Sequence, residues 1–335
     1  MDATTPTDRE IRDEMQRAKS RAASLSVAVG LLLLVVKVGA WLITGSVAIL
    51  SDALESVVHI IAVIFTAYSV RLASRPADRS HPYGHGKVEY FSAGVEGLMI
   101  VIAAIAIVYQ ATMALLRGST PAELEAGTLL TAVAALILVA LGRHIIAVGR
   151  RTRSLALVAD GQHILTDSFT SFGVVAGLAA VYATGWTVLD PLIALVVAAN
   201  ILHTGGHLMR SAVGGLMDEA DAQLLGELAQ SMESLRTDEC IDLHRLRAWR
   251  SSDLVHVDAH LMIPRYRTVM EAHELMHDME SKLRKKMGQE IRLLLHLDPC
   301  SSEFCPACAV SGCSLRTVPF KARPVWELDA IVASV

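Results

Sequence analysis

The stretch SDALESVVH at residues 51–59, together with ADGQHILTD at residues 159–167, decides how this sequence is interpreted. Each stretch carries a carboxylate and an imidazole four residues apart inside a long apolar run. These residues are Glu55 and His59 in the first stretch, and His163 and Asp167 in the second. Four residues are about one helical turn, so each pair is predicted to lie on one face of a helix. Ionisable groups at membrane depth are costly and are found mainly along ion or proton pathways.

Two such pairs facing each other supply two nitrogen and two oxygen ligands in a tetrahedron. A borderline divalent metal such as zinc accepts this ligand set. Asp160 is predicted to share the face of His163 and Asp167, where it would shape the approach to them. The alternative is that the two pairs are interhelical polar contacts that hold a bundle together.

The composition indicates a membrane protein with a soluble part. Of the 335 residues, 53% are hydrophobic, and the mean hydropathy is +0.44. The apolar residues fill the first two-thirds of the chain, and the last third has an ordinary charged composition. The first twenty residues are charged and do not have the pattern of a signal peptide. The net charge of -4 gives no reason to expect nucleic-acid binding.

Six membrane spans are predicted, each near the length of about 20 residues that a bilayer requires. They cover residues 22–44, 46–73, 88–116, 127–148, 155–184 and 190–209. Lys and Arg precede the first span and flank the second and fourth connections, whereas the first and fifth connections have none. Basic residues favour the cytoplasmic side, so both termini are expected in the cytosol.

The polar third is predicted to be a small α+β domain in the order αββαβ. Its elements are expected at residues 218–235, 241–249, 254–263, 268–287 and 290–297. The chain from about Ser301 is expected to be irregular. The predicted domains are a cytosolic N-terminal segment (1–21), a six-helix transmembrane domain (22–209), a cytosolic α+β domain (210–300) and a cysteine-containing tail (301–335).

Two further groups of residues suggest metal binding. Asp78, His81 and His85 lie in the loop between the second and third spans, where Gly84 and Gly86 let the backbone fold around an ion. The alternative for this loop is a basic interfacial segment that binds lipid phosphates. The polar third is rich in imidazoles, which indicates a cytosolic metal site; its candidates are His244, His256, Asp258, His260, His273, His277, His296 and Asp298. Along 254–263, alternation places three of them on one face.

All five cysteines lie in the polar third. Four of them, Cys300, Cys305, Cys308 and Cys313, have the spacing C-x4-C-x2-C-x4-C. Thiolates bind zinc, and a reducing cytosol would leave them free to do so. The spacing lacks the paired C-x2-C arrangement of well-marked zinc modules, so redox-labile thiols are an equally good interpretation.

The chain resembles the cation diffusion facilitators over roughly residues 20–300. The resemblance rests on four motifs in order: SDALESVVH at 51–59, HPYGHGKVE at 81–89, ADxxHxxxD at 159–167 and HxDPC at 296–300. Familiar members carry Asp/Asp or His/Asp on the second span. The pair Glu55 and His59 departs from that pattern and leaves the exact metal open.

The resemblance implies a homodimeric, proton-coupled exporter of divalent metals with a metallochaperone-like cytosolic domain. It places an intramembrane site on Glu55, His59, His163 and Asp167, and an interfacial site on Asp78, His81 and His85. It places a cytosolic binuclear site on His244, His260, His273, His296 and Asp298. It gives no role to the cysteine tail.

The predicted function is therefore export of a divalent transition metal from the cytosol by a multi-pass membrane protein, in the inner membrane if the source is bacterial. Zinc is the first choice and Fe2+ the next, with Co2+ and Cd2+ as further candidates, because two imidazoles argue against manganese and magnesium. Protons are the expected counter-ion, since they compete for carboxylate and imidazole ligands. The alternatives are an intramembrane metalloenzyme, although no catalytic signature supports it, and a membrane metal sensor without transport.

Overall fold

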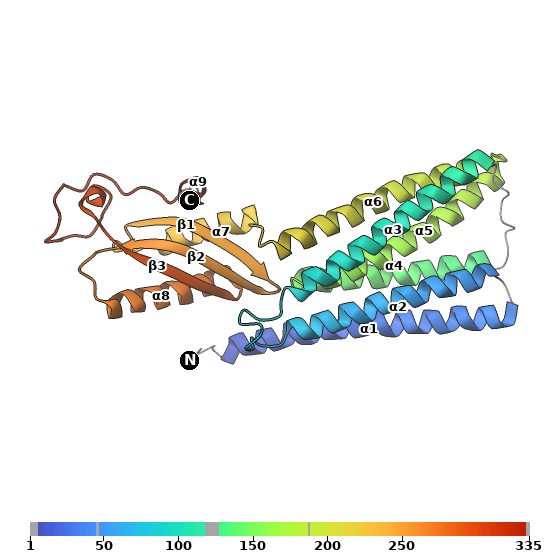
Figure 1. Ribbon diagram of the computed structural model, residues 1–335, viewed down its shortest axis with the longest axis horizontal. Helices are drawn as coiled ribbons and strands as arrows, with labels where there is room; N and C mark the ends of the chain where they lie inside the picture. Colours follow the sequence, from blue (N-terminus) through green and yellow to red (C-terminus); the bar gives the residue numbers. More distant parts are fainter. Residues whose placement is uncertain (1–5, 45–46, 118–126, 187, 333–335) are drawn as a thin grey trace. The chain divides into compact units, whose positions relative to one another are not determined.

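The computed structural model describes residues 6–44, 47–117, 127–186 and 188–332, and for some helical residues, including 51–56, 58 and 59, the backbone alone. The chain divides into two compact units, Met1–Leu216 and Met217–Val335 (Figure 1). The first contains the long helices α1 (Pro6–Thr44), α2 (Val47–Ala73), α3 (Val88–Arg117), α4 (Gly127–Arg151), α5 (Leu155–Thr184) and α6 (Leu189–Leu216). The predicted fold class, a six-helix membrane bundle followed by a small α+β domain, is confirmed.

Helix α1 begins well before the first apolar residues. The charged N-terminal segment continues the span as one helix from Pro6 onward, because its Ala, Arg, Glu, Lys and Met residues are good helix formers. Lys19 in this part of α1 lies 3.4 Å from Glu89 at the start of α3, and both side chains are almost fully buried. Burying two opposite charges is tolerable when they neutralise each other, so this pair ties α1 to α3.

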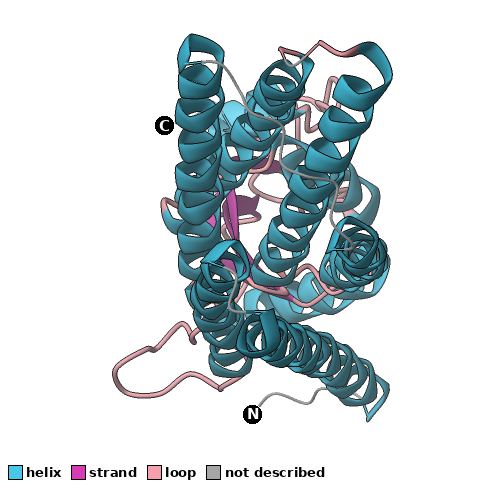
Figure 2. Cartoon of the chain, turned by 90° about the vertical axis from the view of Figure 1, so that its right-hand side faces the viewer, coloured by secondary structure: helices cyan, strands magenta, loops and turns pink. Residues whose placement is uncertain are grey.

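The helices of the first unit pack most extensively in the pairs α3 with α6, α4 with α5 and α1 with α2. Figure 2 views this bundle from the end that is on the right in Figure 1. A Cβ atom on Gly161 of α5 would lie 2.8 Å from the carbonyl oxygen of Gly142 of α4. Likewise, one on Gly97 of α3 would lie 3.2 Å from the carbonyl oxygen of Gly205 of α6. These glycines let helix backbones approach closely.

Within the described residues, three helices are long and apolar enough to cross a membrane by the criterion of length and hydropathy. They include Asp13–Val36 of α1, Val88–Leu116 of α3 and Pro191–Leu216 of α6. Helix α2 contributes a shorter apolar segment, Ile60–Ala73.

The second unit is a three-stranded sheet covered by two helices. Its elements follow in the order α7 (Ala222–Leu235), β1 (Asp242–Ser251), β2 (Leu254–Ile263), α8 (Val269–Met287) and β3 (Ile291–Pro299). The strand order is β1-β2-β3, with β1 antiparallel and β3 parallel to β2. The parallel pair requires a crossover connection, which α8 provides.

Both helices start at side chains that satisfy their free backbone N–H groups. The Asp221 carboxylate accepts from the N–H groups of Gln223 and Leu224 at the start of α7. Thr268 and Glu271 form a reciprocal capping box at the start of α8, and Gly288 ends that helix in the left-handed conformation with a φ of 59°. These local signals fix the lengths of the helices.

One face of the sheet forms the domain core. Alternate residues of β2, including Val255, Val257 and Leu261, pack with those of β3 against apolar side chains of α7 and α8. The intervening residues of β2 and β3 face away from the helices, because successive side chains in a strand point to opposite sides. The histidines of these strands lie on this second face.

The tail is mostly irregular, as expected, but it returns to the domain. It contains a short 3-10 helix, Ser302–Phe304, and a final helix, α9 (Leu328–Val332). Trp326 is buried in the same core as the two helices, and the Arg236 guanidinium lies 4.1 Å from its ring centroid. The tail is therefore attached to the domain at its far end.

Candidate metal centres

The intramembrane candidate site is centred on α5. His163 Nε2 lies 3.8 Å from Asp167 Oδ2, so the predicted pair shares one helix face. The imidazole is largely buried at 10% side-chain exposure, whereas the Asp167 carboxylate is 44% exposed. The pair thus joins a buried nitrogen to an oxygen that an ion can reach.

The other half of this predicted site lies on α2. The side chains of Glu55 and His59 are outside the described residues, so the four-ligand site stays a prediction. The backbone of α2 includes both positions, and α2 packs against both α3 and α5.

A carboxylate that sequence reasoning missed lies beside His163. Glu96 of α3 is 1% exposed, and its Oε2 atom lies 3.6 Å from His163 Nδ1. Thr66 of α2 donates its hydroxyl to Glu96 Oε1 at 3.1 Å, and Ser92 lies 3.2 Å from the same hydroxyl. The signal that could have revealed Glu96 is its position as a lone acid directly before the twenty uncharged residues of the third span.

Asp160 is completely buried one turn before His163. Its charged neighbours are Glu96 and His163, and the hydroxyl of Ser26 on α1 faces it. The polar centre of this unit therefore draws on α1, α2, α3 and α5. Such a concentration of acidic groups favours a bound cation or a bound proton.

The loop between α2 and α3 brings its three predicted ligands together. Asp78 Oδ1 lies 3.4 Å from His81 Nδ1, and Asp78 Oδ2 lies 3.4 Å from His85 Nε2. One donor atom from each of the three residues falls within 4.8 Å of the others, as a shared ion requires. The turn depends on Gly84, whose φ of 91° is strained for a residue with a side chain.

Hydrogen bonds hold the Asp78 carboxylate in its charged form. It accepts from the Ser80 hydroxyl at 2.8 Å, the Ser80 N–H at 2.9 Å and the His81 N–H at 2.7 Å. Chiefly the Ser80 hydroxyl and the His81 N–H lower the pKa of Asp78 to about 2. The carboxylate is therefore ready to accept a cation at any physiological pH.

The sheet of the second unit carries the third cluster, formed by His244, His260 and Asp298, with donor atoms within 4.8 Å of one another. Asp298 Oδ2 lies 3.4 Å from His244 Nε2 and 3.0 Å from His260 Nδ1. His296 joins them, since its Nε2 atom lies 3.3 Å from Asp298 Oδ1. One carboxylate therefore contacts three imidazoles.

Asp242, which sequence reasoning missed, adjoins this cluster. Its Oδ2 atom lies 3.0 Å from His244 Nδ1, so it selects the ring orientation that directs Nε2 toward Asp298. A carboxylate behind a ligating histidine is a common partner in metal sites. The sequence signal is its spacing, two residues before His244 on one strand face.

The remaining imidazoles of the domain lie apart from the cluster. His273 is exposed on α8, which packs on the opposite face of the sheet, and its ring lies 4.4 Å from that of His277. The structure does not bring His273 to the described cluster within one chain, so its role stays a prediction. His256 is buried and stacks on Trp249 at a centroid distance of 4.9 Å.

Comparison with known proteins places these features in a family. Residues 23–217 match the model for the cation efflux transmembrane domain, and residues 222–300 match that for the cation efflux protein cytoplasmic domain. An uncharacterized transporter, sll1263, of Synechocystis sp. is 38% identical over 278 residues, which cover 83% of this chain and 89% of that protein. The cation-efflux pump FieF of Pectobacterium atrosepticum is 31% identical over 294 residues, or 85% and 94% of the two chains. FieF of Escherichia coli is also 31% identical, over 293 residues.

The fold and the clusters define a multi-pass helical membrane protein with a metal-ligand-bearing soluble domain. The two matched domains follow one another along most of the chain, and the relatives match nearly end to end. The chain belongs to the cation diffusion facilitator family of cation efflux transporters. It is a transporter of divalent cations and not an enzyme, so the metalloenzyme alternative is set aside.

Proposed function

We propose that the protein exports a divalent transition metal from the cytosol in exchange for protons. The transport site is formed by Glu55 and His59 of α2 with His163 and Asp167 of α5. The observation that supports this proposal is the His163–Asp167 pair on one face of α5, at 3.8 Å, in a helix that packs against α2. Both termini lie in the cytosol, and two copies of the chain form the working dimer.

Zinc is the proposed physiological metal, with Fe2+ next and Co2+ or Cd2+ as further substrates. Two imidazoles and two carboxylates suit a tetrahedral borderline cation better than manganese or magnesium. The Glu96 carboxyl group behind His163 places a further oxygen beside the site, 3.6 Å from the imidazole.

Proton coupling follows from the chemistry of these ligands. An imidazole must be neutral and a carboxylate ionised in order to bind metal. Protons that arrive from the far side compete for the same atoms and displace the ion. The inward return of protons then restores the site for the next ion, by alternating access.

The cytosolic cluster of His244, His260, His296 and Asp298 is the proposed regulatory site. Metal bound there would bring the cytosolic domains of the dimer together and favour the transporting state. The loop cluster of Asp78, His81 and His85 is the proposed interfacial site. The donor atoms of each of these two clusters lie close together, and neither cluster needs Glu55 or His59 of α2.

The test is zinc uptake into inverted membrane vesicles, with and without a pH gradient. Wild-type protein should accumulate zinc, and the gradient should increase the rate. Asp167→Ala should lose uptake while still reaching the membrane in equal amount. Undiminished uptake by this variant would exclude the proposed site, and uptake that ignores the gradient would exclude proton exchange.

A further inference from the structure

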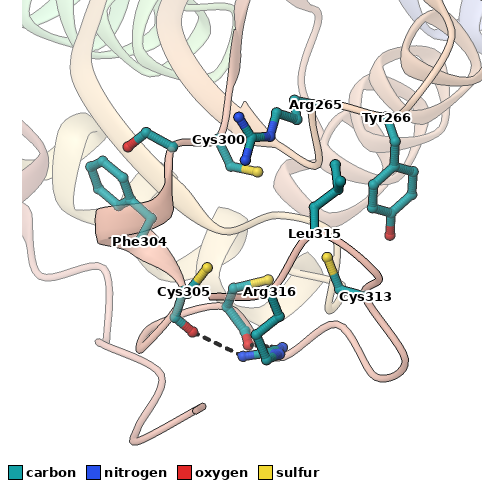
Figure 3. Close-up of a pocket in the computed structure, with 10 residues that line it drawn as sticks. Arg265, Tyr266, Cys300, Phe304, Cys305, Cys313, Leu315 and Arg316 are labelled. Atoms are coloured by element: carbon teal, nitrogen blue, oxygen red, sulfur yellow. Dashed lines mark hydrogen bonds between the residues drawn. The ribbon is translucent and has the colours of Figure 1, made fainter. Parts of the chain in front are cut away.

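The four tail cysteines, which begin where the family match ends, line a single pocket. The cytoplasmic-domain match stops at residue 300, so Cys305, Cys308 and Cys313 lie beyond it. Figure 3 shows the pocket, which Arg265 and Arg316 line together with the four cysteines. The fold therefore gathers four thiols around one pocket.

The backbone around the pocket is held in place at several points. The Cys300 N–H donates to the Ile263 carbonyl at the end of β2 at 2.9 Å. The Arg316 guanidinium donates to the carbonyl oxygens of Cys305, Cys308 and Val310 at 3.0, 2.9 and 2.7 Å. Arg316 thereby holds together the backbone of residues 305–316, which carries three of the four thiols.

Hydrogen-bond donors and positive charge lie beside the sulfurs. The hydroxyl of Thr317 donates to Cys305 Sγ at 3.7 Å. Arg265 and Arg316 provide positive charge beside the sulfurs (Figure 3).

We propose that Cys300, Cys305, Cys308 and Cys313 form a four-thiolate site for a resident soft divalent cation, with zinc as the first choice. A closed set of four thiolates is typical of structural zinc, which stays bound and does not turn over. No three of these sulfurs lie within 4.8 Å of one another in the described part of the chain. Binding must therefore rotate the cysteine side chains inward.

Such a cation fixes the tail to the cytosolic domain. Cys300, Cys308 and Cys313 pack against Ile241 and Met262, at the ends of β1 and β2. Trp326 fixes the other end of the tail in the main core. The bound cation and Trp326 would thus hold the two ends of the intervening segment, and the cation would brace the chain two residues beyond Asp298 of the histidine cluster.

The first experiment loads full-length purified protein with Co2+ as a spectroscopic probe of thiolate coordination. Wild-type protein should show intense sulfur-to-cobalt charge-transfer absorption in the near ultraviolet. Cys305→Ala should lose most of it, and Cys305→Ala/Cys308→Ala all of it. Cys240→Ala is the matched control, because Cys240 is buried away from the pocket beside Thr237, and it should retain the absorption. Absorption that is missing in wild type, or unchanged in the double variant, would overturn the proposal.

The second experiment measures tryptic cleavage within the tail, whose sites include Arg316 and Lys321. Zinc should slow this cleavage at least several-fold in wild type and in Cys240→Ala, and should have no effect on Cys305→Ala. Equal cleavage with and without zinc would contradict the proposed fixing of the tail by a bound cation. Disulfides found by thiol counting would show that the cysteines are redox thiols and not metal ligands. Asp167→Ala should keep the cobalt absorption, so this proposal and the transport proposal fail independently.

Discussion

The cytosolic cluster and the intramembrane site use the same kinds of ligand but are assembled in different ways. In the sheet, backbone register sets the histidines opposite one another, with His244 paired to His260 and His260 paired to His296. In the bundle, His163 meets Glu96 through contacts between side chains of separate helices. Directly opposed residues in a sheet are held about 5 Å apart by hydrogen bonds along the strands, whereas packed helices can move past each other as rigid bodies.

This difference suits a site that holds its ion and a site that releases it. The sheet ligands cannot separate without breaking the strand pairing, which suits the proposed regulatory role of the cluster of His244, His260 and Asp298. The proposed membrane ligands on α2 and α5 would separate if these helices moved past each other, as the proposed alternating access requires. The predictions below test this contrast from its largest consequence to its smallest.

The largest effect is expected from His163→Ala. This change removes the buried imidazole between Glu96 and Asp167 and should lower zinc flux by at least about 100-fold, as measured by uptake into inverted vesicles. Metal binding by the cytosolic cluster should be unchanged in the same preparation. His144→Ala removes an exposed imidazole from neighbouring α4 and is the matched control. Flux in His163→Ala equal to that of the control would break the proposed division between the two sites.

The next largest effect is expected from Asp298→Asn. Asp298 contacts three imidazoles, so its loss should weaken zinc binding at the cytosolic cluster by about 100-fold. The measurement is equilibrium dialysis of full-length protein that also carries His163→Ala, Asp78→Asn and Cys305→Ala/Cys308→Ala, which remove the proposed membrane, loop and tail sites. Asp258→Asn, on the same strand face of β2, is the control and should bind as the parent does. Equal affinity in both variants would show that the cluster is not the regulatory site.

The sequence revealed the parts of each site that follow a local period. The His163–Asp167 pair, four residues apart on α5, and the alternating histidines of β2 are visible because a helix or strand repeats over a few residues. The matching pair on α2 stays a prediction. The loop cluster is likewise contained in the eight residues from Asp78 to His85. The order of helices and strands in the cytosolic domain followed from the same periods.

Periodicity in the sequence does not reveal site residues that come from distant segments of the chain. Glu96 reaches His163 across 67 residues of sequence, and only helix packing brings them together. His273 is of a residue type that binds metals, but it lies on α8, which covers the face of the sheet opposite to that of His260. The N-terminal charges concealed the early start of α1, because charge argues against a membrane core and not against a helix.

Each of the two sites has a carboxylate behind one of its histidines, so the separation of the membrane site from the cytosolic cluster can be measured with matched substitutions. Glu96→Gln and Asp242→Asn each keep the shape of a side chain and remove the charge beside His163 or His244. Each should cost about 10-fold in zinc affinity at its own site, read as the half-saturating concentration for flux and as the dissociation constant of the cytosolic cluster. Each variant is the control for the other. If Asp242→Asn altered flux as much as Glu96→Gln does, the two regions would not act as separate sites.

The smallest effect is expected in the loop, where Ser80→Ala should raise the pKa of Asp78 from about 2 toward 3.8. The lowered pKa means that the hydrogen bonds to the carboxylate are complete above pH 3.8 and are lost as the pH falls through about 2. Without the Ser80 hydroxyl they should be lost at a higher pH. Metal binding by His81 and His85 near neutral pH should not change, because the carboxylate is ionised in both proteins.

Infrared titration of the carboxylate band, taken as the difference from Asp78→Asn, measures this shift. Ser74→Ala is the control, because the Ser74 hydroxyl donates to the Arg71 carbonyl and not to Asp78. An unchanged Asp78 pKa in Ser80→Ala would mean that the backbone N–H groups of residues 80 and 81 hold the charge without the hydroxyl. The loop would then owe its readiness for a cation to backbone geometry, as the sheet cluster does, and not to a replaceable side chain.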